Sequence, residues 1–316
     1  METIWFVLIA VLWTGYFLLE GFDFGVGVLL PFLARDEGER RTVVSTIGPV
    51  WDGNEVWLLV AGGATFAAFP EWYATLFSGF YLPLFLILLA LIARGVALEY
   101  RHKSDSTRGW DRAFFWGSLG PAFLWGVAFA NIVRGVPLDA AHEYTGTLLT
   151  LLNPYALLGG LATLALFTLH GAIFLALRTT GELRSRASRV ARLLAVVAAV
   201  VVSAFLLGLG AFAWVAVLAG LAGAFVATLR GRDGWAFAAS ALAVVAFTAT
   251  LFLSLWPNVL PALNPANSLT VVNAASSPYT LKVMTWVAAI FTPVVLAYQA
   301  WTYWIFRRRL TGANPT

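Results

Sequence analysis

The sequence predicts an all-α polytopic membrane protein, a bundle of about nine transmembrane helices that forms a single domain over residues 1–316. Of the 316 residues, 60% are hydrophobic and only 11% are charged, and the mean hydropathy is +0.81. Soluble domains carry about 25% charged residues, and a domain of about 300 residues still exposes roughly a quarter of its unfolded surface. A water-soluble globule could not hide this much apolar surface, so the composition excludes a soluble enzyme.

The spans are predicted from apolar stretches of about 20 residues, the length of helix that crosses a bilayer core. The nine predicted spans are residues 4–33, 47–69, 73–99, 113–133, 154–178, 190–209, 211–229, 235–257 and 280–306. The start of the chain, Met1-Glu2-Thr3, lacks the basic region of a secretory signal, and the apolar run behind it is too long for one. We therefore expect the first span to remain uncleaved.

Orientation is predicted from the basic residues near the span ends, because cytoplasmic loops are enriched in Lys and Arg. With the N-terminus outside and the C-terminus in the cytoplasm, 18 of the 20 Lys and Arg residues lie inside. The inner segments are 34–46, 94–112, 178–192, 230–232 and the C-terminal tail. This distribution explains the net charge of +4 without an acidic partner, so nucleic-acid binding is excluded.

The sequence contains no cysteine, three histidines and two methionines. This composition excludes disulfides, thiolate-bound metals, iron–sulfur clusters and a cysteine nucleophile. His170 lies in the predicted span 154–178, where we favour a polar contact over haem ligation because no second axial ligand is evident. No phosphate-binding loop, zinc motif or nucleophile triad is present. We expect this chain to bind no metal or cofactor through ligands of its own.

Carboxylates lie within the first three predicted spans, where each costs about 2.5–3.5 kcal/mol on insertion scales and usually serves a pathway or a partner. Glu20 and Asp23 share one helix face of the first span, and Asp52 and Glu55 share a face of the second. From the helix rise, Asp23 lies about 16 Å from the inner end of its span, and Asp52 and Glu55 lie about 8 and 12 Å in. With Glu99 at the end of the third span, the acids fall in the cytoplasmic half of the membrane.

Two interpretations of these acids remain open. In the first, they form a proton-conducting chain that opens to the cytoplasm, because buried carboxyl groups can take up and release protons near neutral pH. Alternatively, they form a structural network that pairs with Arg94 or with basic residues of a partner subunit. Asn54 adds a polar group among the acids, and Trp51 and Trp57 beside them are not readily explained as interfacial tryptophans.

Two motifs are distinctive: Gly21-Phe-Asp-Phe-Gly-Val-Gly27 in the first span, and Gly48-Pro-Val-Trp-Asp-Gly-Asn-Glu-Val-Trp57 at the start of the second. They resemble the signatures of subunit II of cytochrome bd quinol oxidases. Further stretches that resemble this family are residues 61–70, 78–81, 126–131, 152–154 and 283–286. The resemblance extends from the first span to the last and so covers almost the whole chain.

The resemblance implies an all-helical subunit paired as a heterodimer with a similarly built subunit I in a prokaryotic cytoplasmic membrane. In that family subunit I carries two b-type haems and one d-type haem and oxidises a membrane quinol. The heterodimer reduces O2 to water with cytoplasmic protons. Subunit II binds no haem by its own ligands, stabilises subunit I and supplies part of the proton path. Small accessory subunits, membrane lipids and quinone are further partners compatible with the resemblance.

The resemblance also implies roles for single residues. Asp52 matches the pathway aspartate, Glu99 a further pathway acid, and Asp23 the acid of the first motif, whereas Glu55 stands where some members have an amide. We expect protons to enter near Glu99 and to move through Asp52, with Asp23 and Asn54 assisting, into subunit I. Residues with either a pathway or a structural role are Glu20, Glu55, Trp51 and Trp57.

Two other function classes stay open. In a proton-coupled secondary transporter, acids near the membrane midplane would couple protons to a solute, and inverted repeats would be expected. We find no clear repeat, and the acids lie toward one side of the membrane. In a purely structural partner subunit, the acids would only anchor subunit I.

Overall fold

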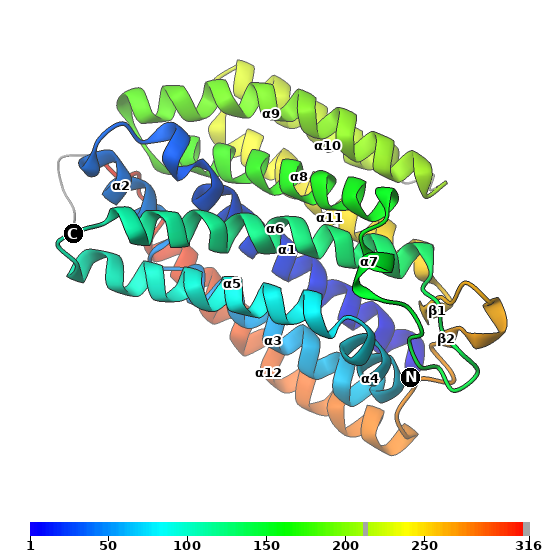
Figure 1. The fold of residues 1–316 in the computed structure, drawn as a ribbon. Helices are drawn as coiled ribbons and strands as arrows, with labels where there is room; N and C mark the ends of the chain where they lie inside the picture. The colour runs from blue at the N-terminus through cyan, green and yellow to red at the C-terminus, as the bar shows by residue number, and fades with distance from the viewer. Residues whose placement is uncertain (211–213, 312–316) are drawn as a thin grey trace.

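The computed structural model describes residues 1–210 and 214–311. Its long helices lie side by side in an elongated bundle (Figure 1). Seven described helices are long and apolar enough to cross a membrane. They are α1 (Glu2–Leu33), α5 (Tyr81–Tyr100), α6 (Arg108–Arg134), α8 (Pro154–Arg178), α9 (Gly181–Gly208), α11 (Asp233–Leu255) and α12 (Pro278–Ile305). Each overlaps a predicted span, and the predicted class of an all-helical membrane protein is confirmed.

Shorter elements complete the described fold. The helices are α2 (Glu37–Ile47), α3 (Trp51–Ala68), α4 (Pro70–Gly79), α7 (Leu148–Leu151), α10 (Trp214–Leu229), η1 (Arg101–Lys103) and η2 (Pro265–Asn267), and the strands are β1 (Asn258–Leu260) and β2 (Leu269–Thr270). Helices α3 and α10 correspond to the predicted spans 47–69 and 211–229, of which residues 211–213 lie outside the described residues. Helix α10 is a shorter apolar helix, and the polar first turn of α3 lowers its hydropathy. Membrane crossing by these two helices stays a prediction.

The structure divides the predicted span 73–99 into two helices, which is a correction. Helix α4 ends at Gly79, and Phe80 separates it from α5. Gly79 packs against the ring of Tyr144, and a Cβ at this position would lie 2.7 Å from that side chain. Pro83 then lies in the first turn of α5, where its missing N–H leaves no helical hydrogen bond unmade. Only α5 has the length of a membrane span.

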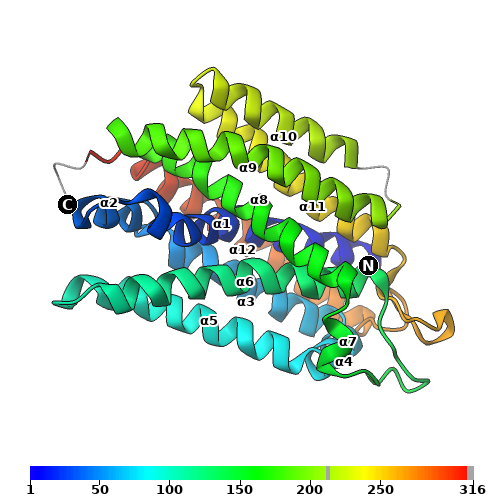
Figure 2. The ribbon, with the colours of Figure 1, turned by 45° about the horizontal axis from the view of Figure 1, so that its top comes forward.

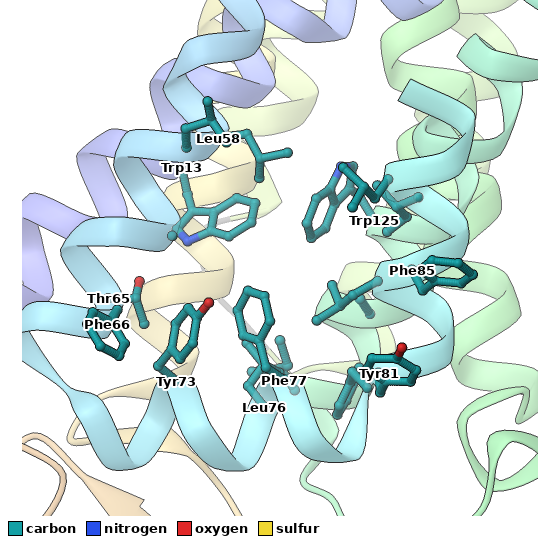
Figure 3. Close-up of a pocket in the computed structure, with 18 of the residues that line it drawn as sticks. Trp13, Leu58, Thr65, Phe66, Tyr73, Leu76, Phe77, Tyr81, Phe85 and Trp125 are labelled. Atoms are coloured by element: carbon teal, nitrogen blue, oxygen red, sulfur yellow. The ribbon is translucent and has the colours of Figure 1, made fainter. Parts of the chain in front are cut away.

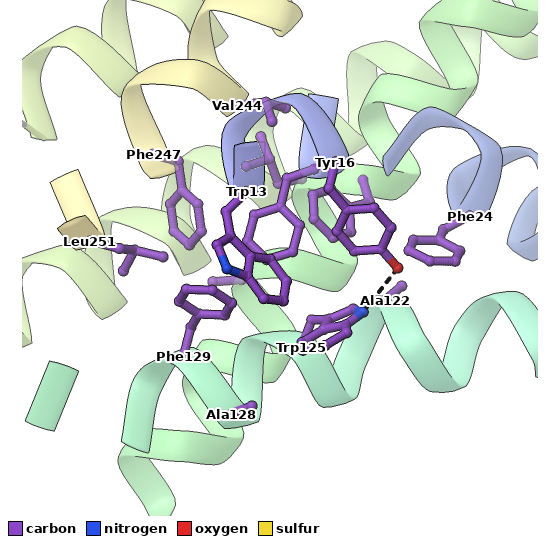
Figure 4. Close-up of a cluster of buried hydrophobic side chains, with 14 of the residues drawn as sticks. Trp13, Tyr16, Phe24, Ala122, Trp125, Ala128, Phe129, Val244, Phe247 and Leu251 are labelled. Atoms are coloured by element: carbon purple, nitrogen blue, oxygen red, sulfur yellow. Dashed lines mark hydrogen bonds between the residues drawn. The ribbon is translucent and has the colours of Figure 1, made fainter. Parts of the chain in front are cut away.

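Helix α1 lies in the middle of the bundle, with α6, α8 and α11 packed around it (Figures 1 and 2). Close approach to α8 depends on glycine, because a Cβ on Gly25 would lie 2.1 Å from the carbonyl oxygen of Phe167. Small residues are the usual way to bring helices together in a membrane. Toward its N-terminal half, α1 instead packs through aromatic rings, where Trp125 donates a hydrogen bond of 3.1 Å to the Tyr16 hydroxyl (Figure 4).

Ion-paired arginines of several predicted inner segments lie near α2, the start of α6 and the C-terminal segment, and Figure 1 shows these segments at one end of the bundle. Asp111 at the start of α6 pairs with Arg40 of α2 at 2.8 Å and with Arg101 of η1 at 2.6 Å. Arg309, which follows the C-terminal end of α12, pairs with Asp233 at the start of α11 at a distance of 2.8 Å. The strands, α7 and the N-terminus lie at the opposite end. This separation fits the predicted orientation, which itself stays a prediction.

Candidate functional site

A buried arginine gathers three carboxylates from two neighbouring helices. Arg94 of α5 forms an ion pair with Glu20 of α1, and one guanidinium nitrogen lies 3.9 Å from Asp23 of the same helix. Another lies 3.9 Å from Glu55 of α3. The side chains of Arg94, Glu20 and Asp23 are fully buried, whereas 25% of the Glu55 side chain is exposed. We call these four residues the Arg94 cluster.

Local sequence explains how the helices bring these charges together. Glu20 and Asp23 are three residues apart on α1 and so face the same side. On α6, Gly117 lies beside Arg94, and a Cβ there would be 2.8 Å from the Cβ of Arg94 and 2.7 Å from the carbonyl oxygen of Ala90. The absent side chain lets α6 press against α5 at this level. The Arg94 guanidinium also lies 5.1 Å from the ring centre of Phe24, within cation–π range.

Helix α12 completes the site through a set of hydrogen bonds around Asn54 of α3. The Asn54 Nδ2 donates to Asp23 Oδ2 at 2.8 Å. Its Oδ1 accepts from the Tyr303 hydroxyl at 2.7 Å and from the Gln299 amide at 3.4 Å. The Trp57 indole N–H in turn donates to Gln299 Oε1 at 2.8 Å. The candidates Asp23, Asn54 and Trp57 are thus connected to one another by contacts that the sequence did not predict.

Sequence reasoning missed Gln299 and Tyr303. A signal for Gln299 was present, because it is a side-chain amide in the middle of the C-terminal half of the predicted span 280–306. Tyr303 had no comparable signal, since aromatic residues near span ends are usual in membrane proteins. Arg94 was recognised only as a partner for the acids in the structural interpretation. Its central position depends on the packing of α5 against α6, from which the long Arg94 side chain reaches the acids of α1.

The two acids that the family resemblance favours most lie on the surface of this chain. Asp52 is exposed in the first turn of α3, where its Oδ1 accepts a hydrogen bond of 2.7 Å from the Gly53 amide. Glu99 is exposed in the last turn of α5, five residues beyond Arg94. Trp51, next to Asp52, lies against Gly95 of α5 and so joins the two helices. The structure does not bring Asp52 or Glu99 into direct contact with the Arg94 cluster.

His170 occupies a polar contact inside the bundle. Its Nδ1 lies 2.8 Å from the Ser240 hydroxyl, and its ring stacks on Phe237 with 4.7 Å between ring centres. The Phe22 ring lies 5.8 Å away on the α1 side. Aromatic side chains therefore fill the space around the imidazole, and no group of three potential metal ligands exists among the described residues.

An apolar pocket of about 490 Å³ lies apart from the Arg94 cluster, between α3, α4, α5 and α6 (Figure 3). Aromatic side chains surround it, among them Tyr73, Phe77, Tyr81 and Trp125. Its lining, within the described part of the chain, includes none of the carboxylates discussed above. Several lining residues of α3 and α5 are exposed on the outer surface, so the pocket opens on that face.

The outer face of α12 has little cover from the rest of the chain. Of its 28 residues only Leu281 is buried, whereas α8 is buried along most of its length. Large aromatic side chains of α12 are exposed, including Trp286, Phe291, Tyr298 and Trp301. Helix α12 packs mainly on α3, beside which it lies in Figure 1.

Comparisons with known proteins give a consistent result over the full chain. The family model of cytochrome bd terminal oxidase subunit II matches residues 1–306. Cytochrome bd ubiquinol oxidase subunit 2 of Bacillus subtilis (strain 168) is 41% identical over 335 residues, which cover 100% of this chain and 98% of the relative. Cytochrome bd-I ubiquinol oxidase subunit 2 of Escherichia coli (strain K12) is 36% identical over 361 residues, which cover 98% of this chain and 95% of the relative.

A solved structure is similar as well. A chain of the bd oxidase from Geobacillus thermodenitrificans superposes with a TM-score of 0.79 and covers 96% of this chain and 98% of its own length. The sequence identity of this pair is 16%, so the likeness concerns the fold alone.

Proposed function

The chain belongs to the cytochrome bd terminal oxidase subunit II family, and we propose that it stabilises a haem-bearing subunit I and supplies part of the proton path for O2 reduction. Membership makes it a multi-pass membrane protein of the bacterial respiratory chain and a subunit of a terminal quinol oxidase. The observation that carries the proposed proton path is the Arg94 cluster, in which three carboxyl groups surround one guanidinium inside the bundle.

The charge balance of the cluster supports proton storage. Three ionised carboxylates and one guanidinium would give a net charge of −2 in a medium of low polarity, which is strongly unfavourable. A proton shared among Glu20, Asp23 and Glu55 relieves this charge. Such a group of carboxyls can accept one proton and pass on another without leaving several unpaired charges buried.

Unpaired polar atoms in the cluster support proton movement through water. Glu20 Oε2, Asp23 Oδ1 and Arg94 Nη2 are buried and make no hydrogen bond with any described residue. Buried polar groups of this kind are usually satisfied by internal water, which makes about three hydrogen bonds to its surroundings. Water bound between these atoms would connect the two carboxyl groups of α1 by hydrogen bonds.

We propose that protons reach the cluster from the end of the bundle where the arginines gather. Asp52 and Glu99 lie on the chain surface toward that end, and Glu55 lies one helical turn deeper than Asp52 on the same face of α3. Glu55 is half-buried and contacts Arg94, so it connects the surface to the buried acids. From Asp23 and Glu20 the proton would continue into subunit I, whose haems supply the electron transfer and O2 chemistry.

The same proposal assigns a partner to the uncovered face of α12. Subunit I would pack against α12 and the adjoining outer faces of α3 and α5. Asp52 and Glu55 lie on α3, so the partner would cover these acids and remove them from lipid. An ionised carboxylate facing lipid is costly, whereas one that faces a second subunit can meet water or a polar group there.

A purely structural role is favoured by one specific observation, the direct ion pair between Arg94 and Glu20. In that case the acids would hold α1, α3 and α5 together and would transfer no protons. The two roles predict different results for Asp52, which makes no contact with the cluster.

The variant Asp52→Asn tests the proton path. Within this chain the one hydrogen bond of the Asp52 side chain is to the amide of the next residue, so the fold of the chain should be retained, and haem content reports whether assembly with subunit I is retained as well. We expect O2 consumption per haem to fall by about 100-fold, the usual contribution of a positioned proton donor. The matched control is Asp105→Asn, an exposed aspartate of the loop between α5 and α6. Native turnover of Asp52→Asn with intact haem would leave only the structural role.

Gentle purification of the tagged chain from its native membrane tests the oxidase assignment itself. We expect a larger haem-bearing subunit to co-purify and the reduced-minus-oxidised spectrum to show b- and d-type bands. A colourless protein without a partner would contradict the assignment and favour a transporter.

A further inference from the structure

The hydrogen bonds around Asn54 have a fixed direction. The indole N–H of Trp57 can only donate, so Gln299 must present its carbonyl oxygen to Trp57. The Gln299 amide N–H₂ then faces Asn54 Oδ1, which also accepts from the Tyr303 hydroxyl. Asn54 therefore presents its N–H₂ to Asp23. One donor-only group thus sets the orientation of two amides in succession.

The opposite orientation of Asn54 is unfavourable at two places. Its carbonyl oxygen would face the Asp23 carboxylate, so that two acceptors would meet. Its N–H₂ would face the Gln299 N–H₂, which cannot turn away without breaking the bond from Trp57. Asn54 is fully buried, so bulk solvent does not reach its amide to compensate for either loss. The Tyr303 hydroxyl adds a further donor for the observed orientation.

We propose that Gln299 and Tyr303 are positioning residues, which together with Trp57 hold the Asn54 amide on Asp23 Oδ2. This inference rests on the proposed proton path and adds a direction to it. An amide held in this way does not carry a proton onward, so Asp23 exchanges its proton only through Oδ1, the oxygen that no described residue bonds. Asn54 then does not carry a proton itself, and its hydrogen bond determines which oxygen of Asp23 exchanges the proton.

The groups that act on Asp23 come from four helices. The guanidinium of Arg94 on α5 is the nearest positive charge, at 3.9 Å. The other titratable groups that face Asp23 are Glu20 on α1, Asp52 and Glu55 on α3, and Tyr303 on α12. His170 on α8 instead bonds Ser240 of α11. Trp57→Phe changes none of these titratable groups, so the orientation of the amide can be tested separately from them.

The variants Tyr303→Phe and Trp57→Phe test the proposal in the purified two-subunit oxidase. Each removes one donor that holds the Asn54 amide in place, so the hydrogen bond from Asn54 to the ionised Asp23 carboxylate weakens. We expect the alkaline midpoint of the turnover–pH profile to move by about one pH unit to higher pH, the shift equivalent to one hydrogen bond to a charged group. Haem content and the spectrum should remain native.

The control variant is Tyr155→Phe, which removes the hydroxyl of a half-buried tyrosine on α8 far from α12 in the sequence. Its profile should match the native enzyme. In an Asp23→Asn background, Tyr303→Phe should produce no further shift, because the carboxylate that Asn54 serves is gone. A shift that persists in this background would contradict the proposal, since it would arise elsewhere.

The outcomes separate this inference from the proposed function. If Asp23→Asn slows turnover while Tyr303→Phe and Trp57→Phe both keep the native profile, the positioning role is overturned and the proton path stands. If Asp23→Asn turns over at the native rate with intact haem, the role of Asp23 in the path fails and the positioning role fails with it. A shift in Tyr303→Phe and Trp57→Phe that disappears in the Asp23→Asn background supports both.

Discussion

At the scale of single residues, the charge of Arg94 partly balances the three carboxylates around it. Arg94 is fully buried and carries the one positive charge among three carboxylates. A buried ion pair contributes little net stability, because both charges lose their water. Loss of one partner is different, since it leaves the other charge buried and unpaired. This asymmetry makes Arg94 the most sensitive residue of the cluster to substitution.

The variant Arg94→Gln should destabilise the protein by about 3–5 kcal/mol, the usual effect of breaking a buried ion pair. Glu20 and Asp23 would then remain without a positive neighbour. Thermal denaturation of the detergent-solubilised complex measures the effect. The control Arg112→Gln removes an exposed arginine of α6 and should leave the midpoint unchanged. Equal midpoints for the two variants would show that Arg94 does not balance the acids.

Single-residue chemistry was predictable from the sequence only where a residue was unusual for its surroundings. Carboxylates inside apolar spans identified Glu20, Asp23 and Glu55, because few other residue types are so costly in a membrane. Their partners were not predictable, since pairing depends on how helices rotate and approach one another. Asp23 meets Asn54 from 31 positions further along the chain, and Tyr303 comes from the opposite end of the sequence. A single sequence carries no record of these distances.

At the scale of elements, glycines decide which helices touch. Gly25 of α1 and Gly171 of α8 face each other, and a Cβ on Gly171 would lie 2.4 Å from the carbonyl carbon of Gly25. The neighbouring backbones cannot move away without separating two central helices. Glycine at these positions therefore serves close packing, while Glu20 and Asp23 on the same helix reach α3 and α5.

The variant Gly25→Ala should separate α1 from α8 and destabilise the fold by about 1–3 kcal/mol, as overpacking does. The control Gly234→Ala adds a methyl group on α11 where nothing lies within 4 Å. It should be neutral or stabilising by up to about 1 kcal/mol, because alanine favours helix. Denaturation midpoints of the two variants provide the comparison. An unchanged denaturation midpoint of Gly25→Ala would contradict this, because it would show that α1 and α8 can move apart at this contact without loss of stability.

Element ends were predictable where apolar runs meet charged segments, as at Leu33 of α1 and Arg178 of α8, whereas α9 begins at Gly181 within the charged segment 178–192. The predicted span 73–99 failed because Phe80, the residue between α4 and α5, is apolar and gives no polar signal. The break at Phe80 depends on contact between Gly79 and Tyr144, a residue of a distant loop. Hydropathy does not record such contacts.

At the scale of the whole molecule, neither the arginines nor the burial of the long helices is evenly distributed. Arginines gather at one end, and the face formed by α12 is the least covered of the long helices. The first feature bears on orientation in the membrane and the second on assembly. Because the sequence contains no cysteine, single introduced cysteines report on either feature without background.

Orientation can be tested with Ala141→Cys and Ser106→Cys, two exposed loop positions at opposite ends of the bundle. With the N-terminus outside, a membrane-impermeant maleimide should label Ala141→Cys in intact cells and Ser106→Cys only after permeabilisation. The reverse pattern would invert the predicted topology. It would also place the surface acids Asp52 and Glu99 on the wrong side for cytoplasmic protons.

The assembly face can be tested by photo-cross-linking from single positions. A benzophenone side chain at Val294 of α12 should cross-link to subunit I in the native membrane. The same group at Val200 of α9, which is also exposed, should not. Cross-linking of subunit I from Val200 alone would assign the interface to the other side of the bundle.

Proton uptake during a single turnover tests the proton path most directly. The fully reduced complex is mixed with O2 in the presence of a pH-indicating dye, while haem oxidation is followed in the same sample. With Asp23→Asn, we expect proton uptake to slow by about 100-fold relative to the native complex, with O2 binding and the haem content unchanged. Proton uptake at the native rate in this variant would contradict a proton path through the Arg94 cluster.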